Sequence, residues 1–148
     1  MEKKFMTFKD AVNKVLICKL KTTKQVIKYY DECREKNKYN KDMIEWNYIS
    51  SKETEETFKK YTSSKDSLIF DDGCGTGWVG FKLKEFGYRN FHCVDLSQKL
   101  LDTISSKFYQ KLIKVDLYQL HDAQDNFYDA TMNVETFTFG YVKPQTLN

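Results

Sequence analysis

The sequence lacks the features that mark membrane, metal-bound or disulfide-rich proteins. No apolar run approaches the roughly 18 residues that a membrane-spanning helix needs, and Met1-Glu2-Lys3-Lys4-Phe5 has no apolar core like that of a signal peptide. The four cysteines form no Cys-x-x-Cys pair and only two histidines occur, which argues against a zinc site. The cysteine spacing also provides no disulfide framework, so we expect a reducing compartment and a cytoplasmic protein without a membrane partner.

Glycine and proline are scarce, with 6 and 1 occurrences. Three of the glycines fall within one five-residue stretch, Gly73 to Gly77, so glycine is placed rather than scattered. Aromatic residues make up 16% of the chain and hydrophobic residues 41%, which argues against wholesale disorder. A chain of 148 residues has room for one domain with a real core.

The net charge of +3 is unevenly distributed, with a basic excess in the first 67 residues and an acidic excess after them. The basic residues alternate with acids along helix-like segments and form no tight cluster. We interpret them as solvated helix faces and do not expect a nucleic-acid partner.

Residues 1–66 are predicted to form an N-terminal helical segment. Apolar residues recur at helical spacing within residues 7–18, and further helices are expected from Thr22 or Thr23 and from Ser50 to about Tyr61. Residues 62–67 are polar and are typical of a linker.

From residue 67 onward, short apolar runs alternate with helix-like stretches. Strands are expected at residues 68–70, 90–94, 112–115 and 128–134. A helix is expected over residues 79–86, ended by Gly87, and another after a Ser97 cap that includes Leu100, Leu101 and Ile104. This alternation predicts an α/β fold with a doubly wound, mostly parallel, Rossmann-like sheet.

Chemistry-bearing residues follow three of these strands. Asp71-Asp72-Gly73-Cys74-Gly75-Thr76-Gly77 follows the first strand, Asp95 ends the second and Asp116 ends the third. Ligands of open parallel sheets bind beyond the carboxyl ends of the strands, where alternate glycines allow close backbone approach. An acid at the end of the second strand can accept hydrogen bonds from both hydroxyls of a ribose. The glycine stretch and the two acids are thus expected at the same edge of the sheet, and together they predict a nucleoside-type ligand.

A dinucleotide is the first alternative, because Gly75-Thr76-Gly77-Trp78-Val79-Gly80 formally satisfies the Gly-x-Gly-x-x-Gly pattern. The first glycine of this pattern lies farther from the end of the strand than a tight strand-to-helix turn requires. An acid two residues before Gly73 also suits a ligand with a cationic amino-acid portion better than a pyrophosphate. An NAD-dependent dehydrogenase is therefore retained as a minor alternative.

The stretch from Asp71 to Gly77 resembles motif I of the class I S-adenosylmethionine-dependent methyltransferases, and residues 68–139 resemble that family in order and spacing. Residues 29–141 more narrowly resemble the methyltransferase-like protein 27 (Williams–Beuren region) group. The closer match rests on Tyr29-Tyr30-Asp31, Tyr39-Asn40-Lys41-Asp42-Met43, Asp95-Leu96-Ser97 and Phe137-Thr138-Phe139-Gly140-Tyr141.

The resemblance implies S-adenosyl-L-methionine as cofactor and a role for each matching residue. The methionine part would be surrounded by Asp71, Gly73, Cys74, Gly75 and Gly77. Asp95 would hold the ribose and Leu96 would lie against adenine, with Asp116 and Leu117 at the adenine edge. Asn133 would lie near the reacting methyl group, and Tyr30 and Tyr39 would belong to an N-terminal lid, unless they are core or interface aromatics.

The chain departs from the family pattern in two places. Cys33 stands where the family usually has Trp, and the spacing from Tyr30 to Tyr39 is longer. The family order 3-2-1-4-5-7-6 implies three more strands than residues 67–148 provide, so we expect a partial methyltransferase domain, truncated at its C-terminal side, with strands 3-2-1-4. The outer edge of its fourth strand would then invite association.

The leading functional hypothesis is methyl transfer from S-adenosylmethionine to an unknown acceptor. A non-catalytic S-adenosylmethionine-binding module, or a truncated methyltransferase product, is the main alternative. No catalytic base is identified, because His92 falls inside an expected strand and His121 in an expected loop, and we expect both to be structural or solvated.

Overall fold

The computed structural model describes residue 20 and residues 22–35, 50–117, 126–134 and 136. The helix expected over residues 7–18, together with Tyr39 and His121, lies outside these residues. The described elements are, in chain order, α2 (Thr23–Glu35), α4 (Ser50–Tyr61), β1 (Leu68–Asp72), α5 (Trp78–Glu85), β2 (Asn90–Asp95), α6 (Gln98–Leu101), β3 (Lys111–Lys114) and β4 (Ala130–Asn133).

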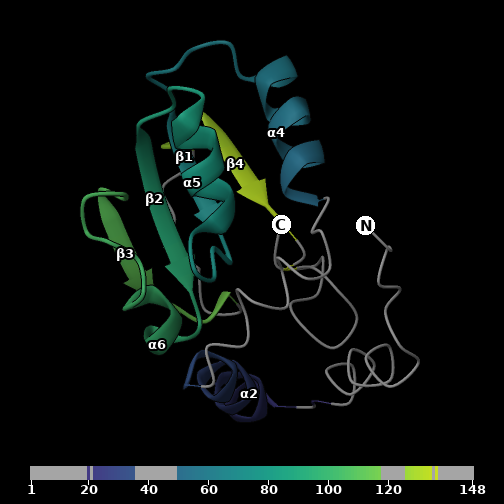
Figure 1. Cartoon of the computed structure of the whole chain (residues 1–148), viewed down its shortest axis with the longest axis vertical. Coiled ribbons are helices and arrows are strands. Elements are labelled where there is room, and N and C mark those ends of the chain that lie inside the picture. Colours follow the sequence, from purple (N-terminus) through teal and green to yellow (C-terminus); the bar gives the residue numbers. More distant parts are fainter. Residues whose placement is uncertain (1–19, 21, 36–49, 118–125, 135, 137–148) are drawn as a thin grey trace, which may run out of the picture.

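The four described strands form one parallel sheet in the order β3-β2-β1-β4, which confirms the predicted fold class and strand order (Figure 1). The chain runs outward from β1 to β2 and β3, and then crosses to the other side of β1 for β4. The direction of winding therefore reverses between β1 and β4. This reversal is the point at which open α/β sheets bind their ligands.

Strand β1 is two residues longer than predicted, because Asp71 and Asp72 continue the ladder. Asp72 pairs with Val94 of β2 and with Asn133 of β4. Both aspartates are buried. A polar pair inside a central strand is not visible to an argument from apolar runs, which is why the prediction ended at Phe70.

Helices α4 and α5 pack together and share the hydrophobic core on one face of the sheet (Figure 1). Phe58 of α4 meets the Tyr88 ring edge-on, with centroids 5.3 Å apart, and Ile69 and Leu83 are fully buried beside them. The Tyr88 hydroxyl donates to the carbonyl of Thr62 at 2.6 Å. Burial of each such apolar side chain contributes about 1.5–3 kcal/mol, so α4 is anchored to the sheet.

The ends of α5 and α6 follow the predicted local chemistry, but α6 is shorter than expected. Gly87 takes a left-handed φ of 94° just after α5. The Ser97 side chain caps α6 by accepting from the amide of Leu100. Helix α6 ends at Leu101, and the chain turns before Ile104, whose side chain still packs against the core.

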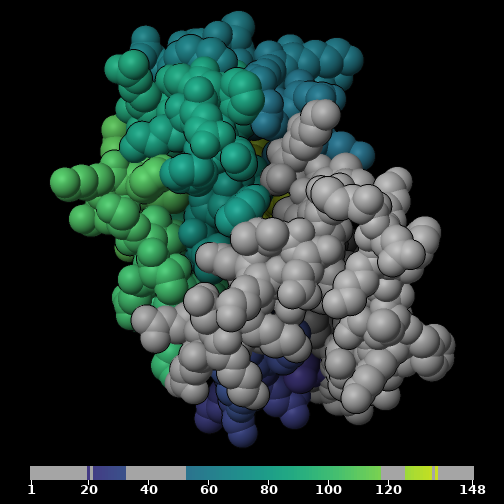
Figure 2. Space-filling view, in the orientation of Figure 1, coloured from purple at the N-terminus to yellow at the C-terminus, as the bar shows by residue number. Residues whose placement is uncertain are grey.

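Helix α2 lies beyond the carboxyl end of β2 and packs against α6 (Figure 1). In the space-filling view it forms the surface at the opposite end of the molecule from α4 (Figure 2). Within the described part of the chain, no helix has the length and hydrophobicity that a bilayer crossing requires.

Candidate functional site

The glycine-rich loop turns tightly over the end of β2. Gly73, Gly75 and Gly77 all have φ between 57° and 76°, a left-handed conformation that side chains with a Cβ rarely adopt. The amides of Gly73 and Cys74 both donate to the carbonyl of Val94, at 3.0 and 3.1 Å. The left-handed backbone of the loop therefore explains why glycine occupies these three alternate positions.

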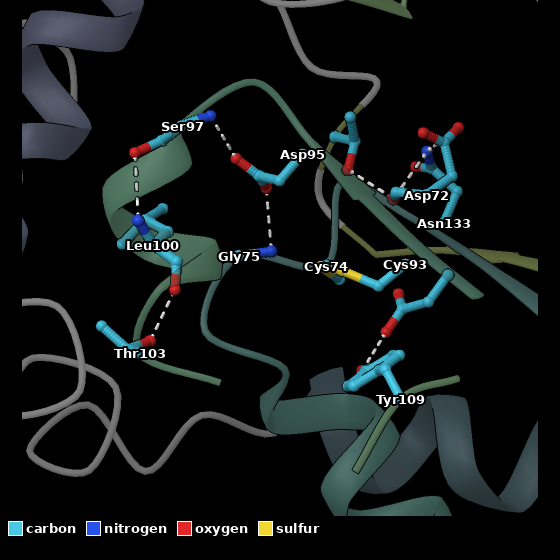
Figure 3. The surroundings of a disulfide bond; sticks show 12 residues. Asp72, Cys74, Gly75, Cys93, Asp95, Ser97, Leu100, Thr103, Tyr109 and Asn133 are labelled. Atoms are coloured by element: carbon cyan, nitrogen blue, oxygen red, sulfur yellow. Dashed lines mark hydrogen bonds between the residues drawn. A yellow bond between two sulfur atoms is a disulfide. The ribbon is translucent and has the colours of Figure 1, made fainter. Parts of the chain in front are cut away.

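Asp95 links this loop to the start of α6. Its Oδ2 accepts from the amide of Gly75 at 2.9 Å and its Oδ1 from the amide of Ser97 at 2.8 Å (Figure 3). Burial raises the pKa of Asp95, while the amides of Ser97, Gly75 and Leu96 oppose that rise. Each carboxylate oxygen can accept a further hydrogen bond. The carboxylate is thus oriented before any ligand arrives, and its spare lone pairs fit a ribose diol.

Two cysteines next to this loop form a disulfide, contrary to the sequence-based expectation. Cys74 of the loop is bonded to Cys93 of β2, 19 residues away, with the Cα atoms 5.9 Å apart (Figure 3). Cys93 pairs with Asp71 in the sheet, and the loop bends back over β2. Sequence spacing alone does not reveal this proximity, because strand pairing creates it.

Asp71 points to the α5 face of the sheet, where its Oδ2 accepts from the Tyr109 hydroxyl at 2.5 Å. A Cβ added at Gly80 of α5 would overlap that hydroxyl, so Gly80 makes room for the contact. Burial raises the pKa of Asp71 to about 7, although the hydrogen bond from Tyr109 lowers it. Burial also raises the pKa of Tyr109. The predicted contact of Asp71 with a cofactor stays a prediction.

Asp72 points to the opposite face, because side chains alternate along a strand. Its Oδ2 accepts from Asn133 Nδ2 at 3.0 Å, and its backbone carbonyl accepts from the Thr136 hydroxyl at 3.1 Å. Burial raises the pKa of Asp72 to about 6; the Asn133 hydrogen bond lowers it, and the charge of Asp95 raises it. Asn133, which was predicted to belong to the site, therefore donates to Asp72, a residue that was not predicted to belong to it.

The residues after β3 lie next to Asp95. The amide of Val115 donates to the carbonyl of Asp95 at 3.0 Å, which holds the ends of β2 and β3 together. Asp116 follows at once, and its Oδ2 accepts from the Thr23 hydroxyl of α2 at 3.4 Å. Leu96 and Leu117 are half-buried beside these acids. The predicted convergence of the glycine loop, Asp95 and Asp116 at one edge of the sheet is thus observed.

Helix α2 contacts the same edge through Asp31. Its Oδ1 accepts from the Ser97 hydroxyl at 2.8 Å, and its Oδ2 lies 3.8 Å from Lys99 Nζ. Tyr30 lies on the same helix, with its ring edge-on to Tyr29 at 5.4 Å between centroids. Ser97 thus connects α2, α6 and Asp95.

Three residues of this region had no predicted role in the site: Asp72, Gly80 and Tyr109. Asp72 had a usable signal, because it and Asn133 end two strands that the predicted order 3-2-1-4 makes neighbours. Tyr109 had none, because only the path of the chain after α6 carries it back to Asp71.

The described fold and site define an open α/β domain with a glycine loop and acidic strand ends at its ligand-binding edge. Residues 70–147, more than half of the chain, match the methyltransferase domain family, and the chain belongs to this family. Members of the family bind S-adenosylmethionine. A search of curated proteins found no match to the chain.

Proposed function

We propose that this protein transfers a methyl group from S-adenosyl-L-methionine to an acceptor molecule. The observation that carries the proposal is the Asp95 carboxylate, held by the amides of Gly75 and Ser97 beside the glycine loop. A fixed carboxylate at the end of the second strand is suited to a ribose, and the loop offers close backbone approach to the rest of the nucleoside.

In this proposal Asp95 and Leu96 hold the ribose and one side of the adenine. Asp116 and Leu117 lie at the adenine edge, which is supported by their position after Val115, whose amide bonds to Asp95 just past β3. Gly73, Cys74, Gly75 and Gly77 cradle the methionine portion, together with Asp71. When bound, the cofactor supplies an already activated methyl group, so the protein's main contributions are alignment and exclusion of water.

We also propose a closer relation to the methyltransferase-like protein 27 group, in which α2 serves as part of a lid. Asp31 and Ser97 belong to two of the segments that carry this resemblance, and their 2.8 Å hydrogen bond joins those segments in space. That contact supports a shared role for α2 and α6 next to Asp95. Tyr30 is the described aromatic residue of the proposed lid.

The outer edge of β4 is a proposed association surface. Among the described strands, β4 pairs with β1 alone. Unpaired strand edges favour association between chains. Sedimentation at increasing concentration tests the proposal, because a chain that stays monomeric throughout would contradict it.

The proposed cofactor site is tested by calorimetric titration of the chain with S-adenosylmethionine, beside Asp95→Ala. Hydrogen bonds to a charged group contribute about 1.5–3 kcal/mol each, so the loss of one weakens binding roughly tenfold or more. Asp102→Ala is the control with the same chemical change, because Asp102 is an exposed acid at the C-cap of α6, where it accepts a hydrogen bond from Gln98. It should leave the affinity unchanged.

Two outcomes would redirect the proposal. A folded chain that binds NAD and ignores S-adenosylmethionine would favour the dehydrogenase alternative. Binding without methyl transfer to any of a broad set of acceptors would favour a non-catalytic binding module.

A further inference from the structure

Asp72 is a buried carboxylate, and one of its oxygens has no hydrogen-bond partner among the residues that the structure describes. The residue is 5% exposed, and its Oδ2 is held by Asn133. Its Oδ1 makes no hydrogen bond with any residue of the described ranges. None of the ion pairs in that part of the chain includes Asp72. Buried carboxylate oxygens are normally satisfied, so this exception calls for an explanation.

The position of Asp72 and Asn133 in the sheet offers an explanation for the oxygen without a described partner. Asp72 and Asn133 are register partners at the last residues of β1 and β4, which flank the point where the winding of the sheet reverses. Ligands of such sheets bind outside this point. Figure 3 shows the two side chains pointing toward each other, apart from the cluster of Asp95, Gly75 and Ser97. The pair is therefore a second polar group at the ligand edge, separate from the proposed ribose contact.

The charges nearby restrict what can fill that place. Asp72 lies close enough to Asp71 and Asp95 for their charges to influence one another. Such a setting repels acceptors that react as anions, namely thiolates, phenolates and carboxylates. A neutral amine brings N–H donors, and its nitrogen becomes positive as it accepts a methyl group. A carboxylate beside that nitrogen stabilises the developing charge.

We propose that Asp72 and Asn133 form the acceptor subsite for an amine, with Asp72 Oδ1 as the base that takes the amine proton. The proposal rests on the proposed methyl transfer. The amine nitrogen attacks the methyl carbon, and a new carbon–nitrogen bond forms while the carbon–sulfur bond breaks. The electron pair of the broken bond stays on sulfur, which becomes a neutral thioether. The proton leaves nitrogen for Asp72, which ends as a neutral acid.

The first test compares transfer of a labelled methyl group from S-adenosylmethionine to 2-aminoethanol, 2-mercaptoethanol and ethylene glycol. These probes have similar size and differ in the nucleophilic atom. Wild-type chain should methylate the amine in preference to the other two. Asp72→Asn, which keeps the shape and the Asn133 contact, should lower amine methylation about 100-fold or more. The exposed Asp66→Asn is the control with the same chemical change.

Two further readouts separate this inference from the proposed function. Calorimetry should show that Asp72→Asn still binds S-adenosylmethionine, with a smaller loss of affinity than the roughly tenfold loss expected for Asp95→Ala. In the chain without cofactor, carbon-13 NMR of labelled aspartate carboxyls should show one signal that 2-aminoethanol shifts and ethylene glycol does not. That signal should be absent from Asp72→Asn.

Each outcome then has a defined meaning. Absence of S-adenosylmethionine binding by wild type would remove the proposed function itself. Cofactor binding together with preferred transfer to the thiol or the hydroxyl, unchanged amine transfer by Asp72→Asn, or no transfer to the small amine would overturn the amine subsite alone.

Discussion

Two neighbouring aspartates of β1 face opposite sides of the sheet and have different partners. Asp71 accepts from Tyr109 beneath α5, and Asp72 accepts from Asn133 at the ligand edge. Burial raises the pKa of both, to about 7 and about 6. At the residue scale, therefore, the charges of the two aspartate side chains change with pH between about 6 and 7.

Asp71→Asn should change how stability depends on pH. The unfolded chain ionises Asp71 near its ordinary value of about 4, whereas the folded chain holds the proton up to about pH 7. Retention of this proton stabilises the folded chain in full below about pH 4. That stabilisation is lost as the pH rises through about 7. Asparagine does not titrate, so the variant should gain roughly 2–4 kcal/mol relative to wild type between pH 4 and 7.5.

Urea unfolding at several pH values measures this difference. Asp66→Asn, at an exposed position, serves as the control and should keep a constant offset from wild type. Identical pH profiles for Asp71→Asn and wild type would mean that Asp71 is already ionised in the folded chain.

At the element scale, polar contacts between described residues join α2 to the sheet edge. Asp31 contacts Ser97 and Lys99, and Thr23 contacts Asp116. The α4–α5 contact, in comparison, is built on buried aromatic and aliphatic side chains. The described side chains of α2 are exposed or half-buried, and elements without fully buried side chains open at lower free energy than core elements. Helix α2 should therefore open more readily than α5.

Asp31→Ala should loosen α2 without disturbing the core. Loss of the Ser97 hydrogen bond removes about 1.5–3 kcal/mol of contact energy, so amides of α2 should exchange with solvent at least tenfold faster. Glu32→Ala is the neighbouring control, because Glu32 is half-exposed and pairs only loosely with Lys28, at 4.0 Å. Hydrogen exchange followed by mass spectrometry measures both variants. Equal protection of α2 in the two variants would show that Asp31 does not hold the helix in place.

At the scale of the whole molecule, the proposed cofactor site would span the carboxyl ends of β1, β2 and β3, three neighbouring strands of one sheet. A ligand that binds only the folded chain, at 100 times its dissociation constant, stabilises it by about 2.7 kcal/mol. For a chain of this length, that corresponds to a rise in Tm of roughly 5–10 °C. Ligand binding should therefore be visible in global unfolding as well as at the site.

A thermal scan with and without S-adenosylmethionine tests this expectation. Asp95→Ala, at the same cofactor concentration, should show about half of the wild-type rise, because a tenfold weaker ligand stabilises by about 1.4 kcal/mol. A full rise in the Asp95→Ala variant would place the cofactor away from Asp95.

The sequence by itself determined the fold class, the strand order and the edge at which the acidic residues and the glycine loop meet. The fold class and this edge depend on local patterns, namely apolar runs, glycines that need left-handed φ, and a cap such as Ser97, each of which acts over a few residues. The strand order came from the resemblance to the methyltransferase family. The predicted convergence of Gly75, Asp95 and Asp116 followed from the rule that parallel strands end at one edge.

Only the tertiary structure decided which side chains meet across those strands. The Cys74–Cys93 disulfide, the Tyr109–Asp71 hydrogen bond and the Asp72–Asn133 pair each join residues 19 to 61 positions apart. Such contacts depend on strand register and on the face to which each side chain points. A shift of register by one residue would reverse every face, and local sequence patterns do not specify the register between separate strands.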